Sequence, residues 1–399
     1  MLHKFTPHLP RYFSKHVSHS FRSLVWSVGM MNFALAAFLI FEPIYLFSLG
    51  YTLAQVLLFY LGVYVVYALI LPFASRILAK IGVEHSIFYS QFFLIGYLLA
   101  LYGISHVPLL IFPAVLLLAL QKLFYWPAFH IDFMSFSDQS QRGREMSSLM
   151  SVSSVMMILG PFVGGFVIEQ FGFPALFLID SALFLLSTIP LLHLHEMRTT
   201  EHESYRSVVN HLRQPERRKD LGTFFGFGEE LIVMVAWPIF IYVIIGDLST
   251  IGSLVASATL VSTLLLLVIG KKTDSSARPI LARTGIYGYI GIWVLRSLAR
   301  IPAAVVIVDA ISQLTKNMLF VPMSTGIYER ASRTLPVSYV VFFEQALSIG
   351  KIVAAVLVIL LTFIFTDPWW PIFILGALFT FFYLRSHYAH PTSRSTLRA

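Results

Sequence analysis

The stretch from His193 to Asp220, HLHEMRTTEHESYRSVVNHLRQPERRKD, is the only long polar interruption in an otherwise strongly hydrophobic chain. Six apolar segments precede it and six follow it, and each is long enough for a membrane-spanning helix, which needs about 20 residues. The predicted fold is therefore an all-helical polytopic membrane protein with twelve transmembrane helices in two six-helix bundles. We predict that the stretch is a cytoplasmic linker and that the functional site lies between the bundles.

The amino-acid composition is typical of a membrane protein. Of the 399 residues, 57% are hydrophobic and only 12% are charged, so a soluble globule could not keep its apolar surface away from water. The net charge of +8 comes from basic residues in short loops and not from one patch. Such a distribution indicates membrane topology, and we expect no nucleic-acid partner.

The sequence lacks the signatures of metal, cofactor and enzyme chemistry. Without cysteine there is no disulfide framework and no thiolate metal site. A Gly-x-x-x-x-Gly-Lys-Ser/Thr phosphate loop is also absent, so ATP-driven transport finds no support. Because no catalytic constellation is recognisable either, we expect no metal, no cofactor and no enzymatic activity.

Five parts are predicted along the chain. They are a basic cytoplasmic arm at 1–23, an N-terminal bundle at 24–192, the linker at 193–221, a C-terminal bundle at 222–385 and a cytoplasmic tail at 386–399. The protein is expected to be a monomer.

The orientation in the membrane follows from the basic residues. Most of the 28 lysines and arginines lie in the arm, the linker, the tail and the loops on the same side, whereas the opposite loops contain only Arg300. This bias predicts that both termini are cytoplasmic in a plasma (inner) membrane. The apolar run from Leu24 to Leu49 after the arm is too long for the core of a signal peptide.

Two short basic turns occupy corresponding places after the second helix of each bundle, as a duplicated six-helix unit would produce. The first reads SRILAKIG (75–82) and the second reads GKKTDSSAR (270–278). In the fifth predicted helix, GPFVGG (160–165) combines a helix-kinking proline with glycines that allow a neighbouring helix to approach closely. This segment suits a gate, although it is equally typical of helices that pack tightly without moving.

These features resemble the major facilitator superfamily of secondary transporters. The turns are similar to the family's Gly-x-x-x-Asp-Arg/Lys-x-Gly pattern at Lys80, Gly82, Gly270 and Asp274, with Arg278 ending the second turn and with Ser75 and Ala79 departing from it. Gly160, Pro161, Gly164 and Gly165 match the Gly-Pro-x-x-Gly-Gly core of the family's antiporter motif, without its upstream glycine. The resemblance implies alternating access between the two bundles and favours export over uptake.

Charged residues inside predicted helices are costly, at about 2.5 to 3.5 kcal/mol each on insertion scales, and mark functional positions. Asp309 and Lys316 are seven residues apart on the tenth helix, as are Glu344 and Lys351 on the eleventh. Because these helices run antiparallel, the spacing predicts ion pairs between Asp309 and Lys351 and between Lys316 and Glu344. The pairs would either lock the helices together or break and reform during transport.

A second group of charges is expected at the inner end of the cavity. The resemblance implies that the first, fourth, seventh and tenth helices line this cavity, so that Lys122 could meet Glu229 or Glu230 across the two bundles. Adjacent residues point about 100° apart on a helix, so only one of the glutamates needs to face the cavity. A buried carboxylate without a basic partner can take up a proton, and we predict Glu230, Glu229 or Glu42 as the carrier.

Aromatic and amide side chains on the same helices predict a cavity for small amphipathic organic compounds. The candidate lining residues are Asn32, Gln121, Tyr125, Phe227, Trp237, Gln313 and Asn317. The predicted function is proton-coupled export of such compounds, with a small-molecule substrate, protons and the lipid bilayer as partners. Two alternatives stay open, which are proton-coupled uptake of a small solute and a sensor or scaffold that does not transport.

Overall fold

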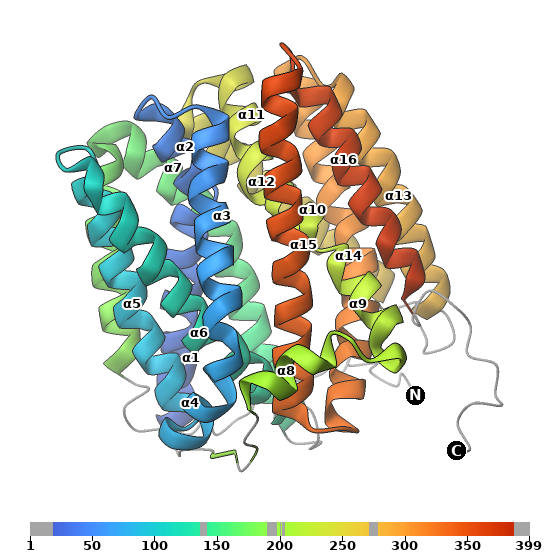
Figure 1. Cartoon of the computed structure of the whole chain (residues 1–399). Coiled ribbons are helices and arrows are strands. Elements are labelled where there is room, and N and C mark those ends of the chain that lie inside the picture. The colour runs from blue at the N-terminus through green and yellow to red at the C-terminus, as the bar shows by residue number, and fades with distance from the viewer. Residues whose placement is uncertain are drawn as a thin grey trace, which may run out of the picture.

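The computed structural model describes residues 19–135, 142–189, 198, 199, 201, 204–270 and 278–386. Within these residues the chain forms helices joined by short turns and contains no β-strand. The predicted fold class is confirmed, because the helical segments give twelve crossings arranged as two bundles beside each other (Figure 1).

The N-terminal bundle contains the first six crossings. Its elements are α1 (His19–Leu39) with α2 (Phe41–Ser48), α3 (Leu53–Ile70) with η1 (Leu71–Phe73) and α4 (Ala74–Ile81), α5 (Val83–Ile104), η2 (Pro108–Leu110) with α6 (Ile111–Ser135), and α7 (Arg142–Thr188). Gly172 has a φ of 81° inside α7 and separates its two limbs, which are the fifth and sixth crossings. Glycine adopts this left-handed conformation without steric cost, so the chain reverses there.

The C-terminal bundle contains the other six crossings. Its elements are η5 (Pro215–Arg217) with α9 (Arg218–Phe225), α10 (Gly228–Leu231), η6 (Ile232–Ala236) and α11 (Trp237–Ile245), then α12 (Leu248–Gly270), α13 (Arg278–Leu298), α14 (Pro302–Ser332), α15 (Pro336–Ile364), and α16 (Trp369–Phe381) with η8 (Phe382–Arg385). The seventh crossing is broken, since η6 is a π-helical turn directly after Glu229 and Glu230. Such π-helical turns are frequent at functional sites.

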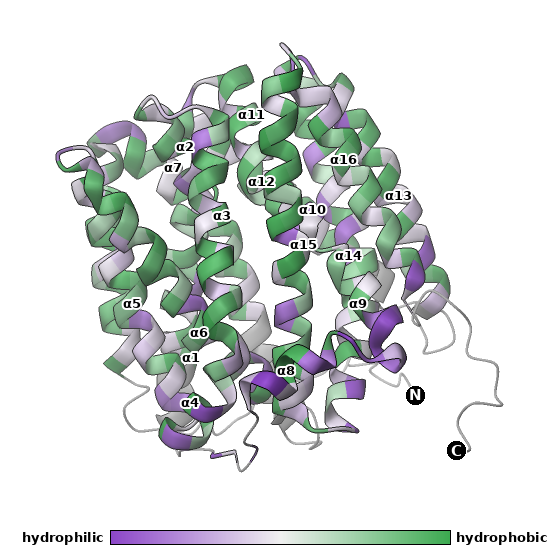
Figure 2. Cartoon of the chain, viewed as in Figure 1, coloured by the Kyte–Doolittle hydropathy of each residue, from purple (hydrophilic) through white to green (hydrophobic). Residues whose placement is uncertain are grey.

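Hydropathy is distributed as a bilayer requires. Nine helical stretches of the described residues are long and apolar enough to cross a membrane, and one of them, Ser151–Thr188, holds two crossings. Figure 2 shows hydrophobic residues along most of the helices, while hydrophilic residues gather where the short helix α8 (Tyr205–His211) lies. We call this the linker end and the opposite end, where α2 and α11 finish, the loop end.

The two bundles touch along two pairs of helices. In the middle of the molecule α3 packs against α15, and α7 packs against α12. At the linker end α8 packs against both α15 and η1, so the linker contacts both bundles. The remaining space between the bundles forms the central cavity.

Candidate functional site

A cavity of about 400 Å³ lies between the bundles and is lined by residues of both. Its N-terminal wall comes from α1, α2, α3, α5, α6 and α7, and its C-terminal wall comes from the seventh crossing, α14 and α15. The charged residues in the lining are Glu42, Lys122, Glu230, Lys316, Glu344 and Lys351, together with His130. The second, third, fifth, sixth and eleventh crossings therefore contribute to the wall, in addition to the four predicted.

Some of the predicted lining residues face the cavity and others do not. Gln121, Tyr125 and Phe227 line it, as predicted. The prediction was wrong for Asn32, which donates to Ser153 Oγ over 3.0 Å. It was also wrong for Asn317, which donates to Ser262 Oγ over 3.1 Å, and for Trp237 and Gln313, which both donate to Asp309. These four side chains lie between helices, because membership of a lining helix does not fix which face a residue occupies.

A cluster of two glutamates and two lysines lies at the break in the seventh crossing. Glu230 Oε2 is 3.0 Å from Lys351 Nζ, and Glu230 Oε1 is 3.5 Å from Lys316 Nζ. Lys316 Nζ is also 3.4 Å from Glu229 Oε1. The cluster joins the seventh crossing to both α14 and α15.

Only one of the two glutamates faces the cavity, as the helical spacing allows. Glu230 lines the cavity. Glu229 is 1% exposed, and its carboxylate accepts hydrogen bonds from Tyr289 over 2.7 Å and from Tyr383 over 3.2 Å. Glu229 is therefore a packed anchor of the C-terminal bundle, whereas Glu230 is accessible to a solute or a proton in the cavity.

The predicted ion pairs between α14 and α15 are not formed. Lys316 and Lys351 contact the glutamates of the seventh crossing instead, and Asp309 accepts from Trp237 Nε1 over 2.8 Å. The physical reason is helix order, because α14 packs mainly against α12 and α13, whereas α15 packs mainly against α3 and the seventh crossing. The spacing predicts the pairs from equal depth in the membrane alone, but helices that follow each other in sequence need not pack closely against each other.

Glu344 belongs to a contact that joins the bundles at the linker end of the cavity. Its carboxylate accepts from the Tyr67 hydroxyl over 2.9 Å and lies 2.9 Å from His130 Nε2. His130 Nδ1 lies 2.9 Å from the Tyr328 hydroxyl of α14. Sequence reasoning missed His130 and Tyr67, although Tyr60, Tyr64 and Tyr67 recur at helical spacing on one face of α3 and could have indicated a polar wall.

Lys122 does not reach Glu229 or Glu230, so the predicted inner gate between them is absent. Its Nζ lies over the ring of Tyr64, 5.2 Å from the ring centroid. Lys351 Nζ lies 5.1 Å from the centroid of the same ring. The two glutamates are already held by lysines of their own bundle, which leaves Lys122 on the opposite wall of the cavity.

Glu42 lies in a polar pocket of the N-terminal bundle. One of its oxygens, Oε1, accepts hydrogen bonds from Tyr60 over 2.8 Å and from Tyr97 over 2.6 Å. Among the described residues, no basic nitrogen lies within 4.0 Å of this carboxylate, although Glu42 lines the cavity. Two tyrosine hydroxyls therefore replace a basic partner.

The segment 160–165 forms the closest helix contacts between and within the bundles. A Cβ atom added at Gly164 would lie 2.1 Å from the carbonyl oxygen of Ala37 in α1. One added at Gly165 would lie 2.6 Å from the carbonyl oxygen of Leu248, and one added at Gly252 of α12 would lie 2.2 Å from that of Pro161. Gly160 is similarly close to α1, so this motif sets the approach of α7 to both α1 and α12.

The basic turns lie at the linker end and outside the central cavity. Gly82 has a φ of 90° and forms the turn between α4 and α5, and Lys80 is exposed. In the second turn Gly270 ends α12 and Arg278 begins α13, while Asp274 lies outside the described residues.

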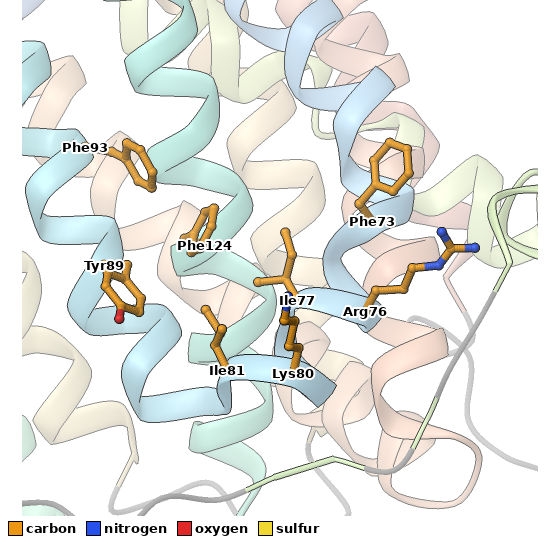
Figure 3. A pocket seen from close by; sticks show the side chains of 8 residues that line it. All are labelled: Phe73, Arg76, Ile77, Lys80, Ile81, Tyr89, Phe93 and Phe124. Atoms are coloured by element: carbon orange, nitrogen blue, oxygen red, sulfur yellow. The ribbon is translucent and has the colours of Figure 1, made fainter.

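A separate hollow of about 490 Å³ lies on the N-terminal bundle near the first basic turn (Figure 3). Its lining residues are Phe73, Arg76, Ile77, Lys80, Ile81, Tyr89, Phe93 and Phe124. None of them lines the central cavity, so this hollow lies apart from the candidate transport site.

Arg296 braces the C-terminal bundle. Its guanidinium carbon lies 4.5 Å from the ring centroid of Trp237 and 4.4 Å from that of Trp293, and Nη2 donates to Ser312 Oγ over 2.6 Å. Asp180 is fully buried, and neither carboxylate oxygen has a hydrogen-bond partner among the described residues. Neither side chain lines the cavity.

Two helical bundles around a cavity that contains charges of both signs define a secondary transporter fold. The family model of the Major Facilitator Superfamily matches residues 20–217, and the chain belongs to that superfamily. It is therefore a multi-pass integral membrane protein.

Solved structures extend the likeness in fold over almost the whole chain. The crystal structure of the nucleoside transporter NupG superposes with a TM-score of 0.66 at 13% sequence identity, covering 92% of this chain and 98% of that one. A structure of a mutant of the same transporter gives a TM-score of 0.67 at 12% identity, covering 91% and 97%. No curated protein matches the sequence.

Proposed function

We propose that the protein is a proton-coupled secondary transporter that moves a small amphipathic organic solute by alternating access. The observation that carries the proposal is the central cavity, which lies between the bundles and contains the cluster of Glu230, Lys316 and Lys351. The linker end faces the cytoplasm in this proposal, in agreement with its basic residues. Because one chain supplies the whole cavity, the protein works as a monomer.

Contacts between the bundles bound the cavity at both ends, which supports alternating access. At the loop end the rings of Phe47 and Tyr242 lie 6.4 Å apart. At the linker end Tyr328 contacts the rings of Phe133, at 4.9 Å, and His130, at 5.7 Å. Opening these contacts in turn would let a solute enter at one end of the cavity and leave at the other.

Proton coupling is proposed for Glu230. Its carboxylate faces the cavity and holds Lys351 at 3.0 Å and Lys316 at 3.5 Å. The sequence predicted a carrier without a basic partner, whereas Glu230 has two, and both ammonium groups favour its ionised form. A proton would therefore bind when a lysine is drawn away, and the neutral carboxyl would tie the seventh crossing less firmly to α14 and α15. Protonation would thereby change the balance between two arrangements of the bundles.

Export and uptake are each supported by a different observation. Export is favoured by the segment 160–165, whose sequence resembles the antiporter motif and which packs α7 against α1 and α12. Uptake is the second candidate, because the fold is similar to that of a nucleoside transporter over 92% of the chain.

The test is solute-dependent proton movement in proteoliposomes with an imposed pH gradient. A pH-sensitive dye inside the vesicles reports proton flux while aromatic organic solutes are added one at a time. We expect flux in the wild type, loss of the flux in Glu230→Gln, and normal flux in Glu216→Gln, which changes an exposed residue of the linker. Equal solute movement with and without the gradient would contradict proton coupling, and the sign of the flux separates export from uptake.

A further inference from the structure

Two ammonium groups from opposite bundles lie against one buried tyrosine ring. Lys122 of α6 and Lys351 of α15 approach the centroid of the Tyr64 ring to 5.2 Å and 5.1 Å, and all three residues line the cavity. Tyr64 is only 2% exposed. Each ammonium group is within reach of the same ring, and like charges repel each other less when an anion lies near both.

The two lysines differ in how their charges are balanced. Lys351 has Glu230 at 3.0 Å. No carboxylate of a described residue lies within 4.0 Å of Lys122 Nζ. An ammonium inside a membrane protein is costly without a partner. Lys122 interacts electrostatically with Glu42 but has no carboxylate in direct contact, so its ammonium is available to an anion in the cavity.

The other carboxylates of the cavity are occupied by different donors. Both hydroxyls that reach Glu42 bond to its Oε1, and Glu344 is bonded by Tyr67 and His130. Each acid thus has hydrogen-bond partners of its own. Among the described charged residues that line the cavity, Lys122 alone has neither an ion pair nor a hydrogen bond to another side chain.

We propose that Lys122 and Lys351, whose ammonium groups both lie near Tyr64, bind the anionic group of the transported solute, a carboxylate or a phosphate. The inference rests on the proposed transport function and names its substrate class, which is an organic anion. An aromatic or aliphatic body attached to this group would lie against the aromatic wall of the cavity. Since the two lysines belong to different bundles, the bound anion would contact both halves at once.

Glu230 competes with the solute for Lys351 in this arrangement. Neutralising its carboxylate frees the ammonium of Lys351, so the site binds an anion more tightly. A proton on Glu230 and an anion on the lysines then favour each other, because each relieves the charge that opposes the other. Such mutual support lets proton and solute move together, which adds weight to the uptake candidate.

The experiment measures equilibrium binding to the detergent-solubilised full chain by quenching of intrinsic tryptophan fluorescence, because Trp126 lines the cavity. The probes are benzoate, phenyl phosphate, uncharged benzamide and cationic phenyltrimethylammonium. We expect both anions to bind, and benzamide and the cation to bind at least about tenfold more weakly, a difference of about 1.4 kcal/mol.

Substitutions at Lys122 and Glu230 are expected to change benzoate affinity in opposite directions. Lys122→Gln should weaken benzoate binding at least about tenfold, Lys122→Arg should retain it, and Glu230→Gln should strengthen it. Lys80→Gln is the matched control, since Lys80 is exposed and outside the central cavity. The proposal would be overturned if the protein preferred phenyltrimethylammonium and Glu230→Gln abolished that preference. It would also be overturned if Lys122→Gln left benzoate binding unchanged, or if neither anion bound saturably at millimolar concentration.

The binding assay uses no membrane and no pH gradient, so its outcome is independent of proton coupling. If anion binding depends on Lys122 while proteoliposomes show no gradient-driven flux, the anion site stands and the proposed proton coupling fails. If flux occurs while the anions do not bind, the transport function stands and the substrate class is wrong.

Discussion

The Nε2 atom of His130 in α6 lies 2.9 Å from Oε1 of Glu344 in α15, so one buried contact joins the two bundles at the linker end of the cavity. His130 is 8% exposed and Glu344 is 3% exposed. A contact with a charged partner contributes about 1.5 to 3 kcal/mol when both groups are buried. This pair is one of the polar ties that must be broken for the linker end to open, together with the hydrogen bond from Tyr67 to Glu344.

Glu344→Gln should therefore open the linker end more often. A loss of about 1.4 kcal/mol shifts the equilibrium between closed and open forms about tenfold. Because the chain contains no cysteine, Gln121→Cys places a single thiol in the cavity wall for labelling with a maleimide. We expect the maleimide to label Gln121→Cys faster when Glu344→Gln is also present. The control substitution Glu216→Gln should leave the labelling rate unchanged. Identical labelling rates would show that the pair does not control access.

Lys316→Gln should destabilise the C-terminal bundle. The substitution leaves Glu229 as a buried carboxylate without a basic partner, and breaking a buried pair in this way costs about 3 to 5 kcal/mol. The double variant with Glu229→Gln should recover much of the loss, because it removes the uncompensated charge. Thermal unfolding of the purified protein in detergent measures both effects. If the double variant is less stable than Lys316→Gln alone, the loss of stability in Lys316→Gln does not come from leaving the charge of Glu229 unpaired.

Gly164→Ala should impair packing of α7 on α1. The added methyl group would lie 2.1 Å from the carbonyl oxygen of Ala37, and overpacking of this kind costs about 1 to 3 kcal/mol. Gly291→Ala is the control, because a Cβ at Gly291 meets no atom within 4 Å. We expect a lower unfolding temperature and less transport only for Gly164→Ala. Equal behaviour of the two variants would contradict the close helix contact.

Asp247 precedes α12 at the loop end, outside the membrane-spanning segments. Hydrogen bonds from the side chain and the N–H of Thr250 hold the pKa of its carboxyl below the ordinary value. Since the lowered pKa belongs to the folded state, this stabilisation is present above the unfolded pKa of about 3.9 and is lost as the pH falls through the folded value.

Asp247→Ala should consequently lower stability by about 1 kcal/mol at neutral pH, the usual contribution of a capping side chain. The difference from the wild type should shrink once the pH falls below about 4. Unfolding temperatures at several pH values check this. A difference that stays constant down to low pH would mean that the ionised carboxylate is not the capping group.

The sequence predicted the helices and the two bundles well, because apolar length and glycine and proline positions are local properties. It also predicted that one of Glu229 and Glu230 faces the cavity, without deciding which. The ion-pair and hydrogen-bond partners of the charged residues were predicted less well. Spacing places Lys316 and Lys351 inside the membrane, but it carries no information about which helices are neighbours. Both lysines therefore bind the seventh crossing, and Asp309 is bonded by Trp237 instead of Lys351.

The polar side chains that line the cavity could not be predicted by pairing acidic with basic residues. Tyr60 and Tyr97 hold Glu42, and His130 holds Glu344. These partners are neutral or weakly basic side chains on other helices, so a balance of acids against lysines and arginines does not find them.

Alternating access is tested most directly by distances between spin labels at the two ends of the molecule. One cysteine pair, Lys80→Cys with Arg333→Cys, spans the bundles at the linker end, and another, His106→Cys with Thr366→Cys, spans them at the loop end; all four residues are exposed. The account predicts that conditions which lengthen one distance shorten the other when the pH is changed or benzoate is added. Distances that stay fixed at both ends, or that lengthen together, would contradict it.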